Sequence, residues 1–285
     1  MTTAQLDRVP LPGSPVTGRR PVWGWTVADG WQVAKRDLLK IPRVPELLFF
    51  SIVQPIIFVL LFVYVFGGAI PVPGGGSYTE FLMAGIFAQT VAFNAASTTV
   101  GLAEDMNRGV IDRFRSLPMA TSGVLVGRTT ADIVRGVITL LVLSLTGLAV
   151  GWRIHDGLAR ATAAFGLLLL FGYCMSWIGA WVGLHMPSPE VANTAGLVWL
   201  FPVTFLSSAF VPIRGMPGWL QHVAEWNPVS TVSLSARQLF GNPTGLPNGS
   251  VPSEHPVLVT LGWVVVILAA FAPLAVRRYG RAFSH

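Results

Sequence analysis

Six long apolar stretches separated by short polar links restrict this chain to one class of fold. They cover residues 47–68, 81–102, 123–152, 161–184, 191–211 and 257–276. A helix of about 20 apolar residues crosses the roughly 30 Å hydrocarbon core of a bilayer. Only 11% of the 285 residues are charged, whereas a soluble domain has about 25%. We therefore predict an all-α polytopic membrane protein with six transmembrane helices in a domain over residues 46–276.

Two other classes fit the sequence poorly. A lipid-facing β-barrel alternates apolar and polar residues, but the apolar runs here are continuous. The net charge of +6 could suggest nucleic acid, yet the basic residues flank the predicted spans, as membrane topology requires. We therefore expect no nucleic-acid partner. The single cysteine, Cys174, lies inside an apolar run, which predicts a buried structural thiol and provides no disulfide or cysteine metal site.

The distribution of Lys and Arg predicts the orientation. Most of them lie in the N-terminal segment, in the link after the second stretch and in the tail over residues 277–285. The links on the opposite side carry only Arg153, Arg160, Arg214 and Arg237. Because cytoplasmic loops are enriched in basic residues, both termini are predicted to be cytoplasmic, and the location is a bacterial cell membrane.

Two amphipathic regions flank the predicted spans. The N-terminal segment, residues 1–45, shows no cleavable signal sequence, and its Trp-containing part predicts a helix lying in the headgroup plane. On the outer side, residues 213–241 predict a pair of short amphipathic helices that break at Asn227 and Pro228. Trp219 and Trp226 of this pair are expected to face lipid or protein.

The sequence lacks several motifs that would bind ATP or a metal ion or would support catalysis. It has no glycine-rich loop followed by Lys and Ser or Thr, so we expect no ATP site of the P-loop type. The five histidines show no metal-ligand spacing, and no nucleophile and base for an intramembrane enzyme stand together. The second, fourth, fifth and sixth stretches lack a central acid, which disfavours a carrier driven by an ion gradient. The energy for transport is therefore expected from another protein.

One charged segment, between the second and third stretches, is the candidate place for that protein to bind. Its candidate contact residues are Glu104, Asp105, Arg108, Gly109, Asp112, Arg113, Phe114, Arg115 and Pro118. A short charged helix held between two spans could move both of them. The spacing alone equally allows an ordinary loop whose charges only set topology. Farther on, Arg128, Asp132 and Arg135 share one helix face, where Asp132 could pair with either arginine.

The sequence EDMNRGVIDRFRSLPMATSGVLVGRTTADIVRGV resembles the region after the second span in ABC-2 type permeases, nearest to daunorubicin/doxorubicin-resistance exporters of actinobacteria. The resemblance implies a coupling helix over about residues 103–116 that docks on a separate ATPase, present in two copies, which binds ATP and Mg²⁺. It also implies a second permease chain, identical or related, and a re-entrant role for the outer helical pair. Family permeases often have an arginine or a second acid after the first glutamate, but Asp105 and Asn107 stand here, which leaves the contact residue open.

Small polar and aromatic side chains of the second and fifth stretches are candidates for the cargo path. They are Gln89, Thr90, Phe93, Asn94, Ser97, Thr98, Phe201, Thr204, Phe205 and Ser208. Such walls suit amphipathic drugs or lipid-like molecules, although the polar groups could equally bond neighbouring helices. An endogenous lipid, polyketide or polysaccharide is an alternative cargo. Glycines of the fourth stretch, including Gly179 and Gly183, predict a close-packing face.

Overall fold

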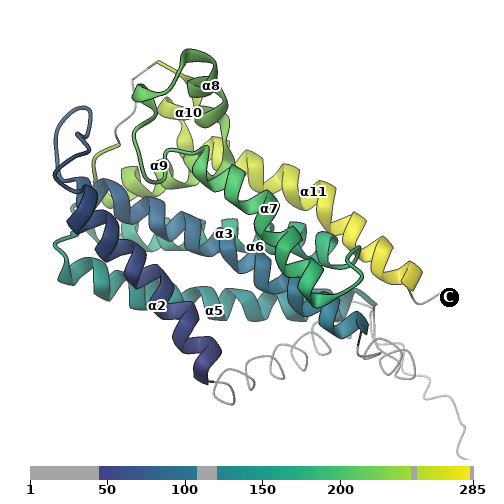
Figure 1. Cartoon of the computed structure of the whole chain (residues 1–285). Helices are drawn as coiled ribbons and strands as arrows, with labels where there is room; N and C mark the ends of the chain where they lie inside the picture. Colours follow the sequence, from purple (N-terminus) through teal and green to yellow (C-terminus); the bar gives the residue numbers. More distant parts are fainter. Residues whose placement is uncertain (1–44, 108–120, 245–248, 283–285) are drawn as a thin grey trace, which may run out of the picture.

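The computed structural model describes residues 45–107, 121–244 and 249–282, and these residues form helices and no strands (Figure 1). The longer helices are α2 (Pro45–Leu61), α3 (Tyr78–Asn107), α5 (Thr121–Ala149), α6 (Gly157–Gly183), α7 (Pro189–Phe205) and α11 (Pro256–Ala282). The shorter ones are α8 (Gly218–Trp226), α9 (Pro228–Phe240) and α10 (Val251–Glu254), with a π-helical turn η2 (Phe62–Phe66) and a 3₁₀ turn η3 (Ile213–Gly215). The predicted interfacial helix within residues 1–45 lies outside the described residues, apart from residue 45.

Each of the six apolar stretches contains a helix. Within the described residues, α3, α5, α6 and α11 are long and apolar enough to cross a membrane. Helix α2 continues into η2, and α7 has 17 residues, which at 1.5 Å each reach about 26 Å. The all-helical fold is therefore confirmed, while the count of six spans remains a prediction. Helix α11 continues to Ala282, so most of the predicted tail extends the last helix.

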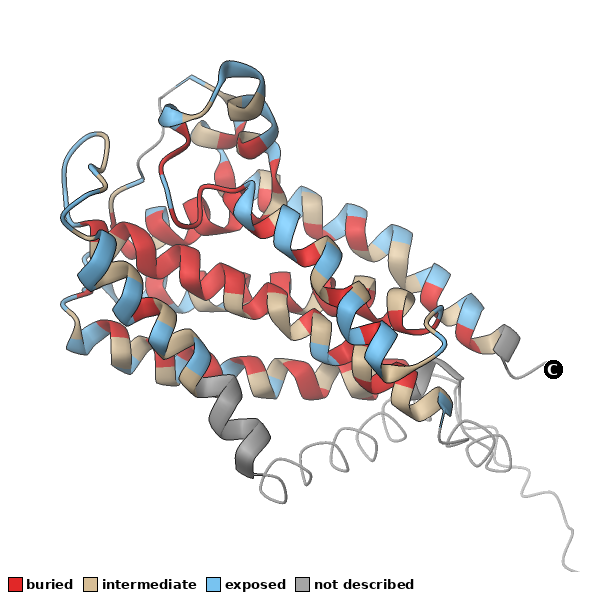
Figure 2. Ribbon diagram, in the orientation of Figure 1, coloured by how far each residue is buried: buried red, intermediate tan, exposed pale blue. Residues whose placement is uncertain are grey.

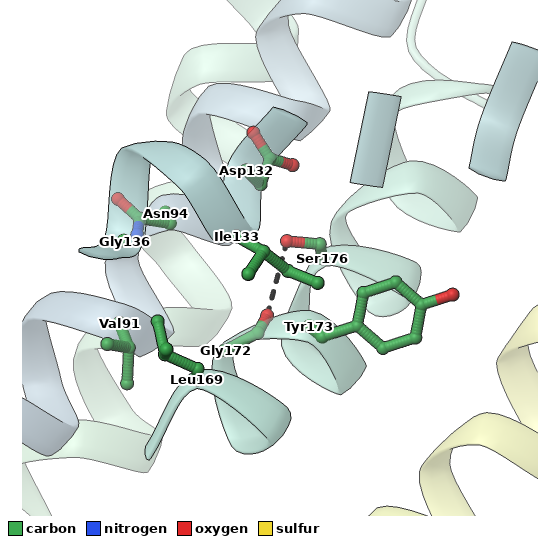
Figure 3. Close-up of a pocket in the computed structure, with 9 residues that line it drawn as sticks. All are labelled: Val91, Asn94, Asp132, Ile133, Gly136, Leu169, Gly172, Tyr173 and Ser176. Carbon is green, nitrogen blue, oxygen red and sulfur yellow. Dashed lines mark hydrogen bonds between the residues drawn. The ribbon is translucent and has the colours of Figure 1, made fainter. Parts of the chain in front are cut away.

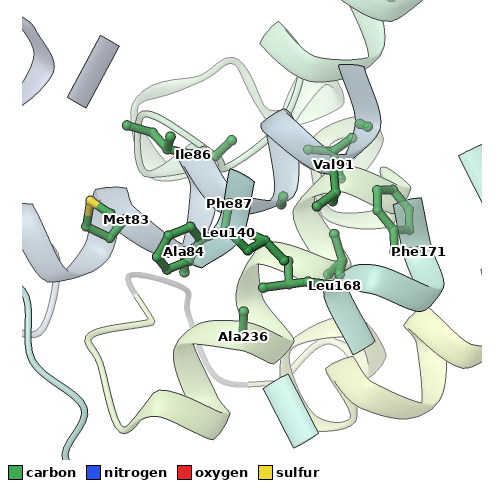
Figure 4. Close-up of a cluster of buried hydrophobic side chains, with 14 of the residues drawn as sticks. Met83, Ala84, Ile86, Phe87, Val91, Leu140, Leu168, Phe171 and Ala236 are labelled. Carbon is green, nitrogen blue, oxygen red and sulfur yellow. The ribbon is translucent and has the colours of Figure 1, made fainter. Parts of the chain in front are cut away.

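Helix α3 is the centre of the bundle (Figure 2). In its most apolar 18-residue window 83% of the residues are buried, against 17% in α11. Its neighbours are α5, α6, α7 and α9. The core that they share includes Phe87, Val91, Leu168 and Phe171 (Figure 4). Helix α3 therefore packs against the other long helices of the bundle except α11.

The glycines of α6 let that helix approach α3 closely, as predicted. A β-carbon at Gly179 would overlap the carbonyl oxygen of Ala95, and one at Gly183 would overlap that of Thr99. The hydroxyl of Thr99 donates to the carbonyl oxygen of Gly179 at 3.0 Å. Small residues let helix backbones pack together where the hydrophobic effect does not drive association. The close-packing face of α6 is therefore confirmed.

The outer pair consists of two helices with very different environments. Helix α8 is mostly exposed, whereas α9 is buried along nearly its whole length. The two meet at Asn227, whose side-chain oxygen caps α9 by accepting from the Val229 amide at 2.8 Å. The predicted break at Asn227 and Pro228 is therefore confirmed, while the re-entrant role of the pair stays a prediction. Helix α9 packs between α3, α6 and α11.

Candidate functional site

The last turn of α3 carries the first two residues of the predicted coupling segment. Glu104 and Asp105 are both partly buried there, and the helix ends at Asn107. The amide of the Asn107 side chain donates to the carbonyl oxygen of Pro187, between α6 and α7, at 3.2 Å. The remaining predicted contact residues lie outside the described residues. They are Arg108, Gly109, Asp112, Arg113, Phe114, Arg115 and Pro118.

Asp105 pairs with Arg128 of α5 in an ion pair whose side chains are each only 13% exposed. The sequence suggested that Arg128 could pair with Asp132 on its own helix. Instead, the guanidinium lies across the backbone of α3 at Gly101, where a β-carbon would overlap it. The absence of a side chain at Gly101 therefore gives Arg128 its route to Asp105.

Asp132 is the second charged residue buried between α3 and α5. Its side chain is 6% exposed, accepts a hydrogen bond from the Thr98 hydroxyl at 2.5 Å and pairs with Arg135 at 2.8 Å. A charged group in an apolar interior is costly unless it is paired and hydrogen-bonded, and both conditions hold here. Of the two predicted partners, Arg135 is the one that binds Asp132.

A small pocket opens beside Asp132 where α3, α5 and α6 meet (Figure 3). Asn94 of α3, Asp132 and Ile133 of α5, and Ser176 of α6 contribute to its lining. The Ser176 hydroxyl donates to the carbonyl oxygen of Gly172 at 3.2 Å, which is also at the pocket wall. The pocket therefore joins one predicted path residue, Asn94, to the charged group on α5.

The predicted path residues divide into two groups. Phe201 and Phe205 of α7 and Ser97 of α3 are exposed, and Phe93 is partly buried. The Phe93 and Phe201 rings meet edge to face with centroids 5.6 Å apart, and Phe201 stacks on Phe205 at 5.6 Å. We call this surface of α3 and α7, formed by Phe93, Phe201 and Phe205, the aromatic face.

Other predicted path residues point into the protein. Thr98, Thr204 and Ser208 are fully buried, as is Gln89 almost completely, while Thr90 is partly buried. The Ser208 amide donates to the Ser230 hydroxyl of α9 at 2.8 Å. The Thr204 hydroxyl has no hydrogen-bond partner among the described residues. The path assignment of these residues stays a prediction.

Arg237 of α9 is a prominent polar residue that the sequence did not indicate as a site. It is completely buried. Its guanidinium donates to the carbonyl oxygens of Phe81 at 2.8 Å, Ser208 at 2.8 Å and Ala209 at 3.1 Å, and lies 3.5 Å over the Phe81 ring. This arginine fastens the irregular segment after α7 to the beginning of α3. The only sequence signal was an arginine in a Ser-rich helix.

The outer aromatic residues lie at the surface. Trp219 is 71% exposed and Trp226 is half-exposed. The indole N–H of Trp263 on α11 donates to the carbonyl oxygen of Trp226 at 3.0 Å. Asn227 also donates to the carbonyl oxygens of Val203 and Leu206, at 2.7 and 3.1 Å. The junction of α8 and α9 is therefore tied to both α7 and α11.

Within the part of the chain that the structure describes, no three His, Cys, Asp or Glu side chains are grouped to hold a metal ion. Cys174 is buried, and its thiol donates to the carbonyl oxygen of Phe171 at 3.0 Å. Among the described residues, Asp105, Asp132 and Asp156 each pair with an arginine.

Comparison with known proteins gives a consistent family. Residues 29–240 match the model of the ABC-2 type transporter family. The chain is 31% identical to a daunorubicin resistance ABC transporter permease protein, DrrB1, of Streptomyces coeruleorubidus, over 94% of this chain and 92% of that protein. It is 26% identical to a probable doxorubicin resistance ABC transporter permease protein, DrrC, of Mycobacterium tuberculosis, over 82% of each chain.

A further relative is an inner membrane transport permease, YadH, of Escherichia coli, which is 24% identical over 78% of this chain and 84% of that protein. These matches include nearly the whole helical bundle and the segment after α3. Members of this family are the membrane components of ABC transporters, and membership implies an ATPase partner. The chain therefore belongs to the ABC-2 type transporter family and is a multi-pass membrane permease.

Proposed function

We propose that this permease is the membrane subunit of an ATP-driven exporter that moves amphipathic drugs or lipid-like molecules out of the cytoplasm or the inner leaflet. The observation that carries the proposal is the end of α3. Its last turn bears Glu104 and Asp105 and leads directly into the charged segment after Asn107. A separate ATPase, in two copies that bind ATP and Mg²⁺, would push on that segment, so this chain would need no cofactor of its own.

The aromatic face supports a path shared with a second permease chain. Phe201 and Phe205 expose nearly half of their surface, and Phe201 contacts Phe93 of α3. An apolar wall with a few polar groups is typical of sites for amphipathic molecules. A second copy or a related permease, set against this face, would enclose the path between the two chains. The names of the two resistance relatives make daunorubicin the first cargo to try.

The proposal includes the membrane arrangement. Six spans would place both termini and the segment after α3 in the cytoplasm, following the basic residues. Helices α8 and α9 would then form a re-entrant element on the outer side. The burial of α9 among α3, α6 and α11 supports that position, because a helix that enters and leaves on one side must be covered by protein.

Coupling is tested by the double substitution Glu104→Ala with Arg113→Ala. We expect the protein to insert and fold normally, because Glu104 makes no hydrogen bond or ion pair with the other described residues. Daunorubicin export and permease-stimulated ATP hydrolysis should fall about tenfold or more, within the usual range of coupling energies between sites. The measurements are uptake into inside-out vesicles and ATPase rate.

The matched control is Asp156→Ala with Arg160→Ala, which removes an exposed ion pair at the start of α6. This control should transport at the unsubstituted rate. Export that persists at full rate in the Glu104 and Arg113 variant would rule out a coupling role for the segment after α3.

One observation favours an alternative, a carrier driven by an ion gradient. Asp132 is an ionisable group buried in a helix long enough to span the membrane, and such groups often form ion pathways. Its contacts with Thr98 and Arg135 explain it equally as part of a fixed network. Export by whole cells distinguishes the two functions. An uncoupler would abolish export by a carrier, whereas loss of the partner ATPase would abolish export by the proposed ATP-driven exporter.

A further inference from the structure

Helices α3 and α5 are connected by charged side chains at two levels. Asp105 pairs with Arg128 near the end of α3. Seven residues earlier on α3, about 10 Å along the axis, Thr98 donates to Asp132. The two helices lie on either side of residues 108–120 in the chain and run in opposite directions, so both contacts lie on one continuous seam. No other pair of described helices has ion pairs between them.

The contact between Asp105 and Arg128 has a defined position on α3. The guanidinium of Arg128 crosses α3 at Gly101, where any side chain would collide with it. Both charged groups are only 13% exposed. A surface ion pair rearranges freely, but a nearly buried pair holds its geometry, because separating two buried charges is costly. Asp105 and Arg128 therefore move together.

The second contact leads to the pocket. Asp132 forms part of the pocket wall together with Asn94, which lies one turn before Thr98 on α3. If α3 shifts, either the hydrogen bond between Thr98 and Asp132 breaks or α5 moves together with α3. The seam begins next to the segment assigned to the ATPase and ends at a residue assigned to the cargo path.

We propose that Arg128 and Asp132 are positioning residues that lock α3 and α5 into one unit, which passes movement from the segment after α3 to the Asn94 pocket. This inference rests on the proposed function. The pairing of Asp105 with Arg128 lies in the same turn as Glu104, which is the acid tested for coupling to the ATPase. If these contacts only stabilised the fold, their loss would lower stability but would leave the effect of nucleotide on the pocket unchanged.

The experiment uses the permease purified with its ATPase from the native membrane, so that no cargo needs to be known. A reporter thiol is introduced at the pocket by Leu169→Cys, in a chain whose buried native thiol is removed by Cys174→Ser. The rate of maleimide labelling is measured with and without ATP and vanadate. Labelling should change about tenfold on trapping nucleotide, as expected for coupled sites.

Asp105→Asn and Arg128→Gln test the first contact, alone and together. Each should reduce the nucleotide effect at Leu169→Cys to less than about twofold, and Arg128→Gln, which lies outside the ATPase-contact segment, should leave ATPase binding and basal hydrolysis intact. Because both residues form one link, the double variant should be no worse than either single one. The control, Asp156→Asn with Arg160→Gln, removes an exposed pair and should keep the full effect.

Thr98→Val tests the second contact with a side chain of similar shape. It should also weaken the nucleotide effect, and it provides the decisive variant if the Asp105 and Arg128 variants fail to fold. A full nucleotide effect in the variants that fold would overturn the inference, as would single losses that multiply in the double variant. A permease that purifies with no ATPase would instead overturn the proposed function itself.

Discussion

Replacing Arg237 with methionine is expected to prevent most of the chain from keeping its folded structure. Methionine fills a similar volume but leaves the carbonyl oxygens of Phe81, Ser208 and Ala209 without the donors that now reach them. Each buried polar group that loses its partner costs about 1–3 kcal/mol. Three such losses approach the roughly 5–15 kcal/mol that stabilises a typical folded protein. The segment after α7 would then separate from α3.

The measurement is thermal unfolding of the detergent-solubilised permease, followed by size-exclusion chromatography. Arg237→Lys should unfold between the methionine variant and the unsubstituted chain, because an ammonium lacks the planar fork that reaches several carbonyls. Arg160→Met is the matched control, since Arg160 is 65% exposed and its loss should leave unfolding unchanged. An unfolding temperature of Arg237→Met equal to that of the control would contradict the role assigned to Arg237.

Two alanine substitutions in α6 are expected to have opposite effects. Gly179→Ala places a methyl group on the carbonyl oxygen of Ala95 in α3, so the two helices must separate. Gly166→Ala introduces the same methyl group where nothing lies within 4 Å. In an unconstrained helix, alanine is favoured over glycine by about 1 kcal/mol. Gly166→Ala should therefore leave stability unchanged or raise it, whereas Gly179→Ala should lower it by about 1–3 kcal/mol, the usual cost of overpacking.

Unfolding temperatures of the two variants, measured in one detergent, provide the comparison. The pair is informative because composition, helix and added atom are identical, and only the neighbour differs. Equal unfolding temperatures would mean that the approach of α6 to α3 at Gly179 is not a constraint on the fold.

The helices could be predicted from the sequence because the apolar pattern that defines each of them is local. An apolar run of about 20 residues has few alternatives in a bilayer, where backbone groups must bond internally. The close-packing glycines of α6 were visible for a similar reason, since their spacing alone defines a face. Helix ends were less accurate, as the continuation of α11 to Ala282 shows.

The polar contacts between distant segments were not predictable in the same way. Arg237 was assigned to an outer link by counting basic residues, yet its partner Phe81 lies 156 positions away. Arg128 had an acidic neighbour on its own helix, so nothing in the spacing pointed to Asp105. Such pairings depend on how helices pack, and packing is decided by the whole bundle.

The cargo path was difficult for another physical reason. Ser97 and Thr98 are adjacent in sequence, but one is exposed and the other is buried against Asp132. Polar residues that bond helices and polar residues that face a path look alike in composition. In the proposed arrangement the aromatic face becomes a wall only when a second chain stands opposite it, and one sequence contains no record of that partner.

The central claim is that this permease does not supply its own energy. It is tested most directly by daunorubicin flux into sealed vesicles that contain the permease alone or the permease with its ATPase. We predict ATP-dependent accumulation only when both proteins are present, and none in vesicles with the permease alone, whether or not an ion gradient is imposed. Accumulation by the permease alone would contradict the account.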